Sequence, residues 1–250
     1  MNHDQIKNLA HKLGLFGIHQ NIEARANEAV SNSLHPNEFL QLLLEDEALN
    51  RKNRFAKSLL SRAKFRNSSE LEDWDKTFER GLSKQKIKEL SSLSFFNNKE
   101  NLIILGRTGE GKTHLAVAVG RRLCSEGLST AFLPVNFLFE EVLAAKSSGK
   151  YLGYLKKLSQ TKVLVLDDFG LRNYTHDEAN TLVDLLEERS RKGPVIVTSQ
   201  VDPKGWGKLF EDQVISEAIV DRLENPSQKI TLKGGSYRER LGQNSTTTSN

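Results

Sequence analysis

The stretch GRTGEGKTH, residues 106–114, lies between the apolar run NLIIL at 101–105 and the helix-prone segment HLAVAVGRRL. Its Gly106, Gly111, Lys112 and Thr113 satisfy the pattern G-x-x-x-x-G-K-[ST], set between a strand and a helix as that pattern requires. Glycines let backbone N–H groups converge on phosphate oxygens, and the following helix presents its positive N-terminal end. We therefore expect a phosphate-binding loop. The alternative is a glycine turn that only closes a strand–helix unit.

Two side chains of this loop have expected roles toward the cofactors ATP and Mg²⁺. Lys112 is expected to reach the β- and γ-phosphates, and the Thr113 hydroxyl is expected to ligate the magnesium ion. The residues expected to surround the nucleotide are Gly106, Arg107, Thr108, Gly109, Glu110, Gly111, Lys112, Thr113 and His114.

A pair of acids follows the apolar run at 162–166 in KVLVLDDFG. Ligands of open α/β sheets bind at the carboxyl ends of the strands, which is where this pair is expected. Asp167 is expected to hold magnesium, directly or through water, and Asp168 to polarise the attacking water. An acid pair that only caps a helix is the alternative.

One strand and one helix, in TAFLPVNFLFEEV at 130–142, separate the loop from the acidic strand. This order is typical of P-loop ATPases with an additional strand. The next strand, PVIVTSQ at 194–200, would end beside the γ-phosphate. Gln200 is the candidate for sensing that phosphate and aligning water, followed by Thr198 and Ser199, although such residues are also common in turns.

Apolar residues recur at helical spacing through residues 4–66, without the alternation of a strand. From residue 102 onward, short apolar strands alternate with helical segments, which predicts an α/β fold with a mainly parallel sheet and helices on both faces. We expect a small all-helical domain that binds DNA or a partner, a nucleotide-binding domain, and a polar, disordered tail. Their expected bounds are 1–68, 69–241 and 242–250.

Composition narrows the class of protein. The 250 residues are 37% hydrophobic and 27% charged, which is ordinary for a soluble globular protein. No apolar run approaches the roughly 18 residues that cross a bilayer, and the N-terminus is too polar for a secretory signal, so a cytoplasmic location is expected. One cysteine and six scattered histidines argue against disulfides and structural zinc. A net charge of +4 hints mildly at nucleic acid.

A basic stretch, RKNRFAKSLLSRAKFR at 51–66, carries seven cations and no acid. On a helix, its cations would surround a narrow apolar stripe and could contact DNA phosphates. The alternative is a solvated helix face whose cations pair with the acids at 45–47. A second basic set lies around KSSGKYLGYLKKL. The candidate DNA-binding residues are Arg51, Lys52, Arg54, Lys57, Arg62, Lys64, Arg66, Lys146, Lys150, Lys156 and Lys157.

Arg222 lies near the end of a predicted helix in SEAIVDRLENP. It could act on the nucleotide of a neighbouring subunit, as arginine fingers do, but its spacing alone favours a surface salt bridge with Asp221 or Glu224.

The order and separation of several motifs resemble those of the AAA+ ATPases of the helicase-loader and transposition-helper group, and above all the IstB-like ATPases of bacterial insertion sequences. The motifs are GRTGEGKTHLAVAVG, VLVLDDFGL, PVIVTSQ, AIVDRL and GGSYR, with LEDWD ahead of them. The resemblance implies an ATP-dependent protein that multimerises on duplex DNA, remodels it, and recruits or stimulates a transposase. It also implies that Arg222 acts in trans and that Arg238 is the second sensor arginine.

Three positions depart from the pattern of this group. Gln200 stands where Asn is more frequent, Asn225 stands where His is frequent, and Asp168 replaces the Glu of AAA+ enzymes in general. The shorter carboxylate of Asp168 suggests slow hydrolysis. Two alternatives share the loop: a DnaC-like helicase loader that acts on single-stranded DNA, and a P-loop kinase of a small molecule.

Overall fold

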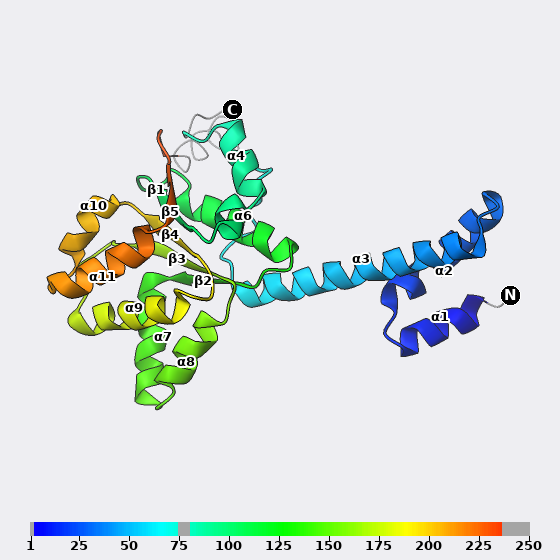
Figure 1. Ribbon diagram of the computed structural model, residues 1–250, viewed down its shortest axis with the longest axis horizontal. Helices are drawn as coiled ribbons and strands as arrows, with labels where there is room; N and C mark the ends of the chain where they lie inside the picture. The colour runs from blue at the N-terminus through cyan, green and yellow to red at the C-terminus, as the bar shows by residue number, and fades with distance from the viewer. Residues whose placement is uncertain (1–2, 75–80, 237–250) are drawn as a thin grey trace, which may run out of the picture. The chain divides into compact units, whose positions relative to one another are not determined.

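The computed structural model describes residues 3–74 and 81–236, so Arg238 and the tail at 242–250 lie outside the described residues (Figure 1). The chain divides into two compact units, Met1–Ser58 and Leu59–Asn250, and the division falls within the long helix α3 (Pro36–Ala63). The expected domain boundary near residue 68 stays a prediction.

The first unit is all-helical, as expected, and contains α1 (His3–Lys12), α2 (Phe16–Ser31) and the first part of α3. A buried carboxylate joins two of these helices: Glu47 of α3 accepts a hydrogen bond from Gly17 N–H at 2.7 Å, at the start of α2. A Cβ on Gly17 would lie 2.4 Å from the carbonyl oxygen of Asp46, so only glycine fits there. The negative carboxylate therefore faces the positive end of α2 at close range.

In the described part of the second unit, five strands form one sheet, and all of its pairings are parallel. The strand order is β2-β3-β4-β1-β5. The strands are β1 (Asn101–Leu105), β2 (Thr130–Pro134), β3 (Val163–Phe169), β4 (Val195–Ser199) and β5 (Ser227–Thr231). Strand β4 lies between the phosphate-loop strand β1 and the acidic strand β3, which confirms the additional-strand arrangement.

Helices cover both faces of the sheet (Figure 1). Successive strand residues point to opposite sides, so both faces carry apolar side chains that helices bury. Leu102 and Ile104 of β1 join the core beneath one set of helices, whereas Ile103 and Leu105 join the core beneath the other. The first set is α4 (Lys84–Ser91), α5 (Ser94–Asn97) and α6 (Lys112–Ser125). The second set is α7 (Val135–Ser147), α8 (Tyr151–Ser159), α9 (His176–Arg189), α10 (Pro203–Trp206), η1 (Gly207–Leu209) and α11 (Gln213–Glu224).

The four expected strands are all present, and β5 is an additional one that the sequence analysis missed. This strand, SQKIT, pairs with β1 at an edge of the sheet, and only Ile230 within it is buried. Among the described helices, none has both the length and the apolar character that crossing a membrane requires.

Candidate nucleotide site

The loop between β1 and α6 has the backbone conformation that its glycines allow. Gly111 is the N-cap of α6 and has a φ of 98°, in the left-handed region that side chains with a Cβ rarely adopt. The first amides of α6 thus point into the loop, where no residue of the helix can accept their hydrogen bonds. Such a turn fits the phosphates of ATP, because they accept hydrogen bonds and carry negative charge.

Two side chains within the loop hold its shape. Glu110 is 4% exposed, and its Oε2 accepts a hydrogen bond from Arg107 N–H at 2.6 Å. Lys112 is also buried, and its Nζ donates to the Arg107 carbonyl at 3.0 Å. The ammonium of Lys112 therefore lies within the loop rather than in solvent. The sequence placed Glu110 among the nucleotide contacts, whereas the structure gives it a bond inside the loop.

Asp167 and Thr113 are brought together although 54 residues separate them. The Thr113 hydroxyl lies 3.1 Å and 3.2 Å from the two carboxylate oxygens of Asp167, which is completely buried. Burial raises the pKa of Asp167, as does the charge of Asp168, while hydrogen bonds from Thr198 and Thr113 act in the opposite direction. A buried carboxylate beside a hydroxyl is the oxygen donor set that suits Mg²⁺, so these residues fit the expected ion.

Asp168 adopts a φ of 61°, which is uncommon for a residue with a side chain. It lies in an irregularity of the ladder between β3 and β4, between Leu166 and Phe169. Its N–H donates to the Thr198 hydroxyl at 2.9 Å. The same Thr198 hydroxyl donates to Asp167 Oδ1 at 2.6 Å. Thr198 thus contacts both acids.

Gln200 lies beside the phosphate loop. Its Oε1 accepts a hydrogen bond from the Thr108 hydroxyl at 3.0 Å. Ser199, by contrast, is fully buried and bonds to the carbonyl oxygens of Phe169 and Val201. A cavity of about 420 Å³ adjoins the loop. Its lining residues include Gly106, Arg107, Glu110, Gln200, Asp202 and the stretch 231–234 that follows β5.

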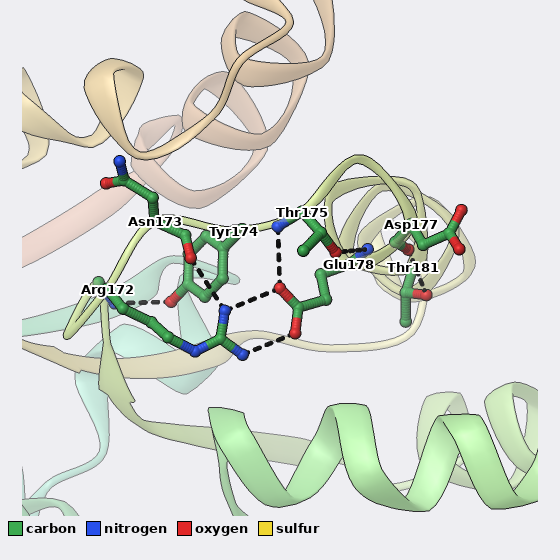
Figure 2. Close-up of polar contacts among 8 residues, drawn as sticks. Arg172, Asn173, Tyr174, Thr175, Asp177, Glu178 and Thr181 are labelled. Carbon is green, nitrogen blue, oxygen red and sulfur yellow. Dashed lines mark hydrogen bonds and ion pairs between the residues drawn. The ribbon is translucent and has the colours of Figure 1, made fainter.

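The turn after the acid pair is held by its own polar contacts (Figure 2). The Tyr174 hydroxyl accepts a hydrogen bond from Gly170 N–H at 2.6 Å, and burial raises the pKa of that phenol. The carboxylate of Glu178 accepts hydrogen bonds from Nη1 and Nη2 of Arg172, at 2.9 Å and 2.6 Å. Glu178 also forms a capping box with Thr175 at the start of α9. These contacts hold the turn between Asp168 and α9 in place.

The segment SELEDW at 69–74 also contacts α6. His114 Nδ1 lies 2.9 Å from the Ser69 hydroxyl, and its ring packs edge-on against Trp74 with ring centroids 5.8 Å apart. Arg121 pairs with Glu70. The burial of Trp74 makes this segment part of the core of the second unit.

Arg222 lies near the amino end of β1, whereas the phosphate loop follows the carboxyl end of that strand. Its backbone carbonyl accepts a hydrogen bond from Asn101, the first residue of β1, at 2.8 Å. Its guanidinium pairs with Glu187 of α9, with Nη2 and Oε2 3.1 Å apart, and Asp221 and Glu224 pair elsewhere. It lines a cavity of about 680 Å³ whose other cations are Lys99, Lys162, Arg189, Arg191 and Lys192. The phosphate loop of the same subunit begins after the last residue of β1.

The candidate DNA-binding cations have varied surroundings, and all eleven are exposed. Arg51 pairs with Glu47 at 2.7 Å, which matches the alternative of pairing with the acids at 45–47. Arg54 stacks on the Phe16 ring, Lys146 on the Tyr151 ring, and Lys64 pairs with Glu141. No described residue pairs with the side chains of Lys57, Arg62, Lys150, Lys156 or Lys157 among the hydrogen bonds, ion pairs and ring contacts of the structure.

Arg66 has a different neighbourhood from the other cations. Its guanidinium lies 5.8 Å from the centroid of the Phe137 ring, at the start of α7. Its charge also lowers the pKa of Asp167, although less than burial raises it. Arg66 is therefore near the acidic strand, a position that the basic stretch at 51–66 did not reveal.

Comparison with known proteins identifies the family. The family model described as IstB-like ATP binding protein matches residues 8–245. The chain belongs to this family. The chain is 33% identical over 234 residues to the insertion sequence IS21 ATP-binding protein of Pseudomonas aeruginosa, with 94% of the chain and 88% of that protein covered. It is 31% identical over 237 residues to the IS5376 protein of Geobacillus stearothermophilus, with 95% and 94% covered.

The solved structures place this IstB-like protein in the AAA+ fold. The crystal structure of the DnaC helicase loader matches with a TM-score of 0.55 and 20% identity, covering 66% of this chain and 97% of that one. The resemblance stated from the motifs is thereby confirmed, and so is the fold. The IstB-like protein is an ATPase.

Proposed function

We propose that this IstB-like ATPase is an ATP-dependent regulator of DNA transposition that multimerises on duplex DNA, remodels it, and recruits or stimulates a transposase. The position of Arg222 carries the proposal. Arg222 lies at the amino end of β1, whereas the phosphate loop follows its carboxyl end, so a role for this guanidinium in hydrolysis would be at the nucleotide of another subunit. An ATP site completed between subunits makes hydrolysis depend on assembly.

Within that site, we assign catalytic roles to Lys112, Asp168, Gln200 and Arg222. Lys112 binds the phosphates, Asp168 orients water, and Gln200 senses the γ-phosphate from its place beside Thr108. Thr113 and Asp167 hold Mg²⁺, which supplies positive charge to the phosphates when bound. Arg238, outside the described residues, is proposed as the second sensor on the basis of its motif.

The DNA contacts are proposed on charge and exposure. Exposed cations without acidic partners, such as Lys57, Arg62 and Lys150, are free to neutralise phosphates. Phosphate contacts position a protein but carry little sequence information, so binding is expected to be weakly specific and strongly salt-dependent. This suits a cytoplasmic protein that selects a target region of DNA for a transposase. A transposase reading frame beside the gene would support that partner.

The mass of the particles formed by Asp168→Asn tests the proposal. This variant should bind ATP and stall in the assembled state, because it loses the carboxylate that orients water. Its mass is measured with ATP on duplex and on single-stranded DNA, at matched low and moderate salt. ADP and Lys112→Ala are the controls, and neither should assemble.

Multimers that need both ATP and duplex DNA are the expected result. Assembly on single strands alone would instead identify a DnaC-like helicase loader. Failure to assemble on either DNA would reject the proposed DNA-dependent multimer.

A further inference from the structure

The ladder between β3 and β4 contains a bulge at the acid pair. Leu166 pairs with Val197 and Phe169 pairs with Ser199, so Asp167 and Asp168 together lie opposite the single residue Thr198. In a regular strand, adjacent side chains point to opposite faces of the sheet. A bulge re-aims a side chain and interrupts this alternation, which is why bulges often lie next to active sites. Here it allows two consecutive acids to serve one site.

The bulge removes Asp168 from the regular ladder, so its N–H needs another acceptor. The Thr198 hydroxyl is that acceptor, at 2.9 Å. A partly buried N–H without a partner would destabilise the bulge, and the left-handed backbone of Asp168 adds strain. By accepting this hydrogen bond, the side chain of Thr198 stabilises the left-handed conformation of Asp168 in the bulge.

The same hydroxyl has one hydrogen to donate. Because it accepts from Asp168 N–H, that hydrogen is directed to Asp167 Oδ1, 2.6 Å away. Thr198 is completely buried, and no water is needed to complete either bond. One hydroxyl thus connects the backbone of Asp168 with the carboxylate of Asp167, and its donor and its acceptor are both used.

We propose that Thr198 is a positioning residue for ATP hydrolysis: its hydroxyl replaces a ladder carbonyl in the bulge and thereby orients the Asp168 carboxylate relative to Asp167. Gln200, two residues further along, keeps the role of contacting the γ-phosphate. This role of Thr198 rests on the proposed role of Asp168 in orienting water. It does not involve the transposase. The kcat is measured with duplex DNA present, so that the subunits can assemble, whereas ATP affinity and amide exchange are measured without DNA.

Ser199 provides a matched control. It is the next residue, it is equally buried, and its hydroxyl also bonds to backbone, but to the carbonyls of Phe169 and Val201. Loss of the Ser199 hydroxyl should weaken the same end of β4 without freeing the Asp168 N–H. The comparison separates a general loss of stability from a specific loss of orientation.

The test compares Thr198→Val, Thr198→Ser and Ser199→Ala in full-length protein. Thr198→Val keeps the shape of the side chain and removes its hydroxyl, whereas Thr198→Ser keeps the hydroxyl. Three quantities are measured: ATP affinity without magnesium, kcat, and the hydrogen-exchange rate of the Asp168 amide by NMR. The exchange rate reports on the bulge in the absence of any ligand.

Thr198→Val should bind ATP within about twofold of wild type, while kcat falls roughly 10- to 100-fold, as misplacement of a catalytic group by about 1 Å would cause. Its Asp168 amide should exchange at least about tenfold faster, because the hydrogen bond that protects it is lost. Thr198→Ser should restore both kcat and protection. Ser199→Ala should lower the unfolding temperature and leave the exchange of the Asp168 amide unchanged.

Wild-type kcat and amide protection in Thr198→Val would overturn the role of Thr198, as would equal losses in Thr198→Val and Thr198→Ser. If Thr198→Val does not fold, Thr198→Cys, with a weaker donor of similar size, is compared with Thr198→Ser in its place. Asp168→Asn is the reference variant. Full hydrolysis by Asp168→Asn would remove the proposed role of Asp168, whereas its inactivity beside a fully active Thr198→Val would remove only that of Thr198.

Discussion

The guanidinium of Arg222 on α11 pairs with the carboxylate of Glu187 on α9, with Nη2 and Oε2 3.1 Å apart. The side chain of Glu187 is 67% exposed and that of Arg222 is 31% exposed, so water and salt screen the pair. Exposed pairs of this kind contribute only about 0–1 kcal/mol. Separating Arg222 from Glu187 should therefore cost little free energy.

A mixture of two inactive variants should test whether Arg222 acts on another subunit. Arg222→Ala keeps its own phosphate loop and should bind ATP without hydrolysing it. Lys112→Ala should fail to bind ATP but keeps Arg222. Mixing them should restore part of the ATPase activity, because the arginine of one subunit completes the site of the other. A mixture as inactive as its components, or normal hydrolysis by Arg222→Ala alone, would exclude action in trans.

Release of Arg222 from Glu187 should favour productive assembly. In Glu187→Gln, the arginine loses its acidic partner in the isolated subunit, so less interaction must be broken before it reaches a phosphate. We expect the protein concentration at half-maximal ATPase activity to fall by about two- to fivefold, the range that a pair of up to about 1 kcal/mol allows. Glu188→Gln, on the same turn of α9 but paired with Lys192, should have no such effect.

Lys112→Ala should weaken ATP binding by at least about tenfold, because the buried ammonium that lies within the phosphate loop is lost. Binding of a fluorescent ATP analogue measures this change. Lys204→Ala, which removes an exposed lysine from α10, serves as the control and should bind normally. Unchanged affinity in Lys112→Ala would refute the role given to the loop.

The basic stretch should contribute to DNA binding unequally. Lys57→Ala and Arg62→Ala should each weaken binding to any sequence and reduce the salt dependence, the slope of log K against log[salt], by about one. Arg51→Ala should have a smaller effect, because its guanidinium already pairs with Glu47 at 2.7 Å. Fluorescence anisotropy at several salt concentrations measures both quantities. Equal losses in all three variants would mean that the pairing of Arg51 does not limit its contact with DNA.

Glu47 should make the stability of the helical unit depend on pH. Burial acts to raise its pKa, but hydrogen bonds from Arg51, Gly17 and Ile18 outweigh it, so the pKa lies below the usual 4.5. An acid with a lowered pKa stabilises the fold above its unfolded pKa and loses that contribution as pH falls through the folded value. Thermal unfolding should therefore show a loss of stability below about pH 4.5. Glu47→Gln should be less stable by about 1–3 kcal/mol at pH 7 and should lack this dependence.

The sequence predicted the central strands because each is a short apolar run between turns. It predicted the phosphate loop because glycine, lysine and threonine occur at the spacing of the phosphate-binding pattern G-x-x-x-x-G-K-[ST]. It did not reveal β5, since an edge strand with one buried residue, Ile230, has no apolar run. It named Thr198 and Ser199 as further candidates for sensing the phosphate, after Gln200, and left open that they are turn residues. The hydrogen bond from Asp168 N–H to Thr198 depends on the bulge between β3 and β4, and no local sequence pattern predicts that bulge.

Arg189 illustrates a second limit of sequence reasoning. An arginine in the last turn of an amphipathic helix reads as a solvated charge, yet this side chain is 1% exposed. Burial lowers its pKa to about 10. Its guanidinium donates to carbonyl oxygens that precede β3 and β4, including those of Thr161 and Pro194 at 3.1 Å and 3.0 Å. Such a site exists only after the two turns have come together, so no spacing in the sequence predicts it.

The insertion of β4 between β1 and β3 has a consequence for synthesis on the ribosome. When a nascent chain has reached Phe169, it contains the phosphate loop and both acids, but the strand that must lie between them has not been made. Strand β1 then lacks both of its neighbours, β4 and β5, and β3 lacks β4; such unpaired edges attract other strands. We expect ribosome-stalled chains that end before residue 195 to need a chaperone and to be unable to bind ATP. Chains extended beyond β4 should bind ATP and should no longer need a chaperone, and both changes should occur at the same chain length.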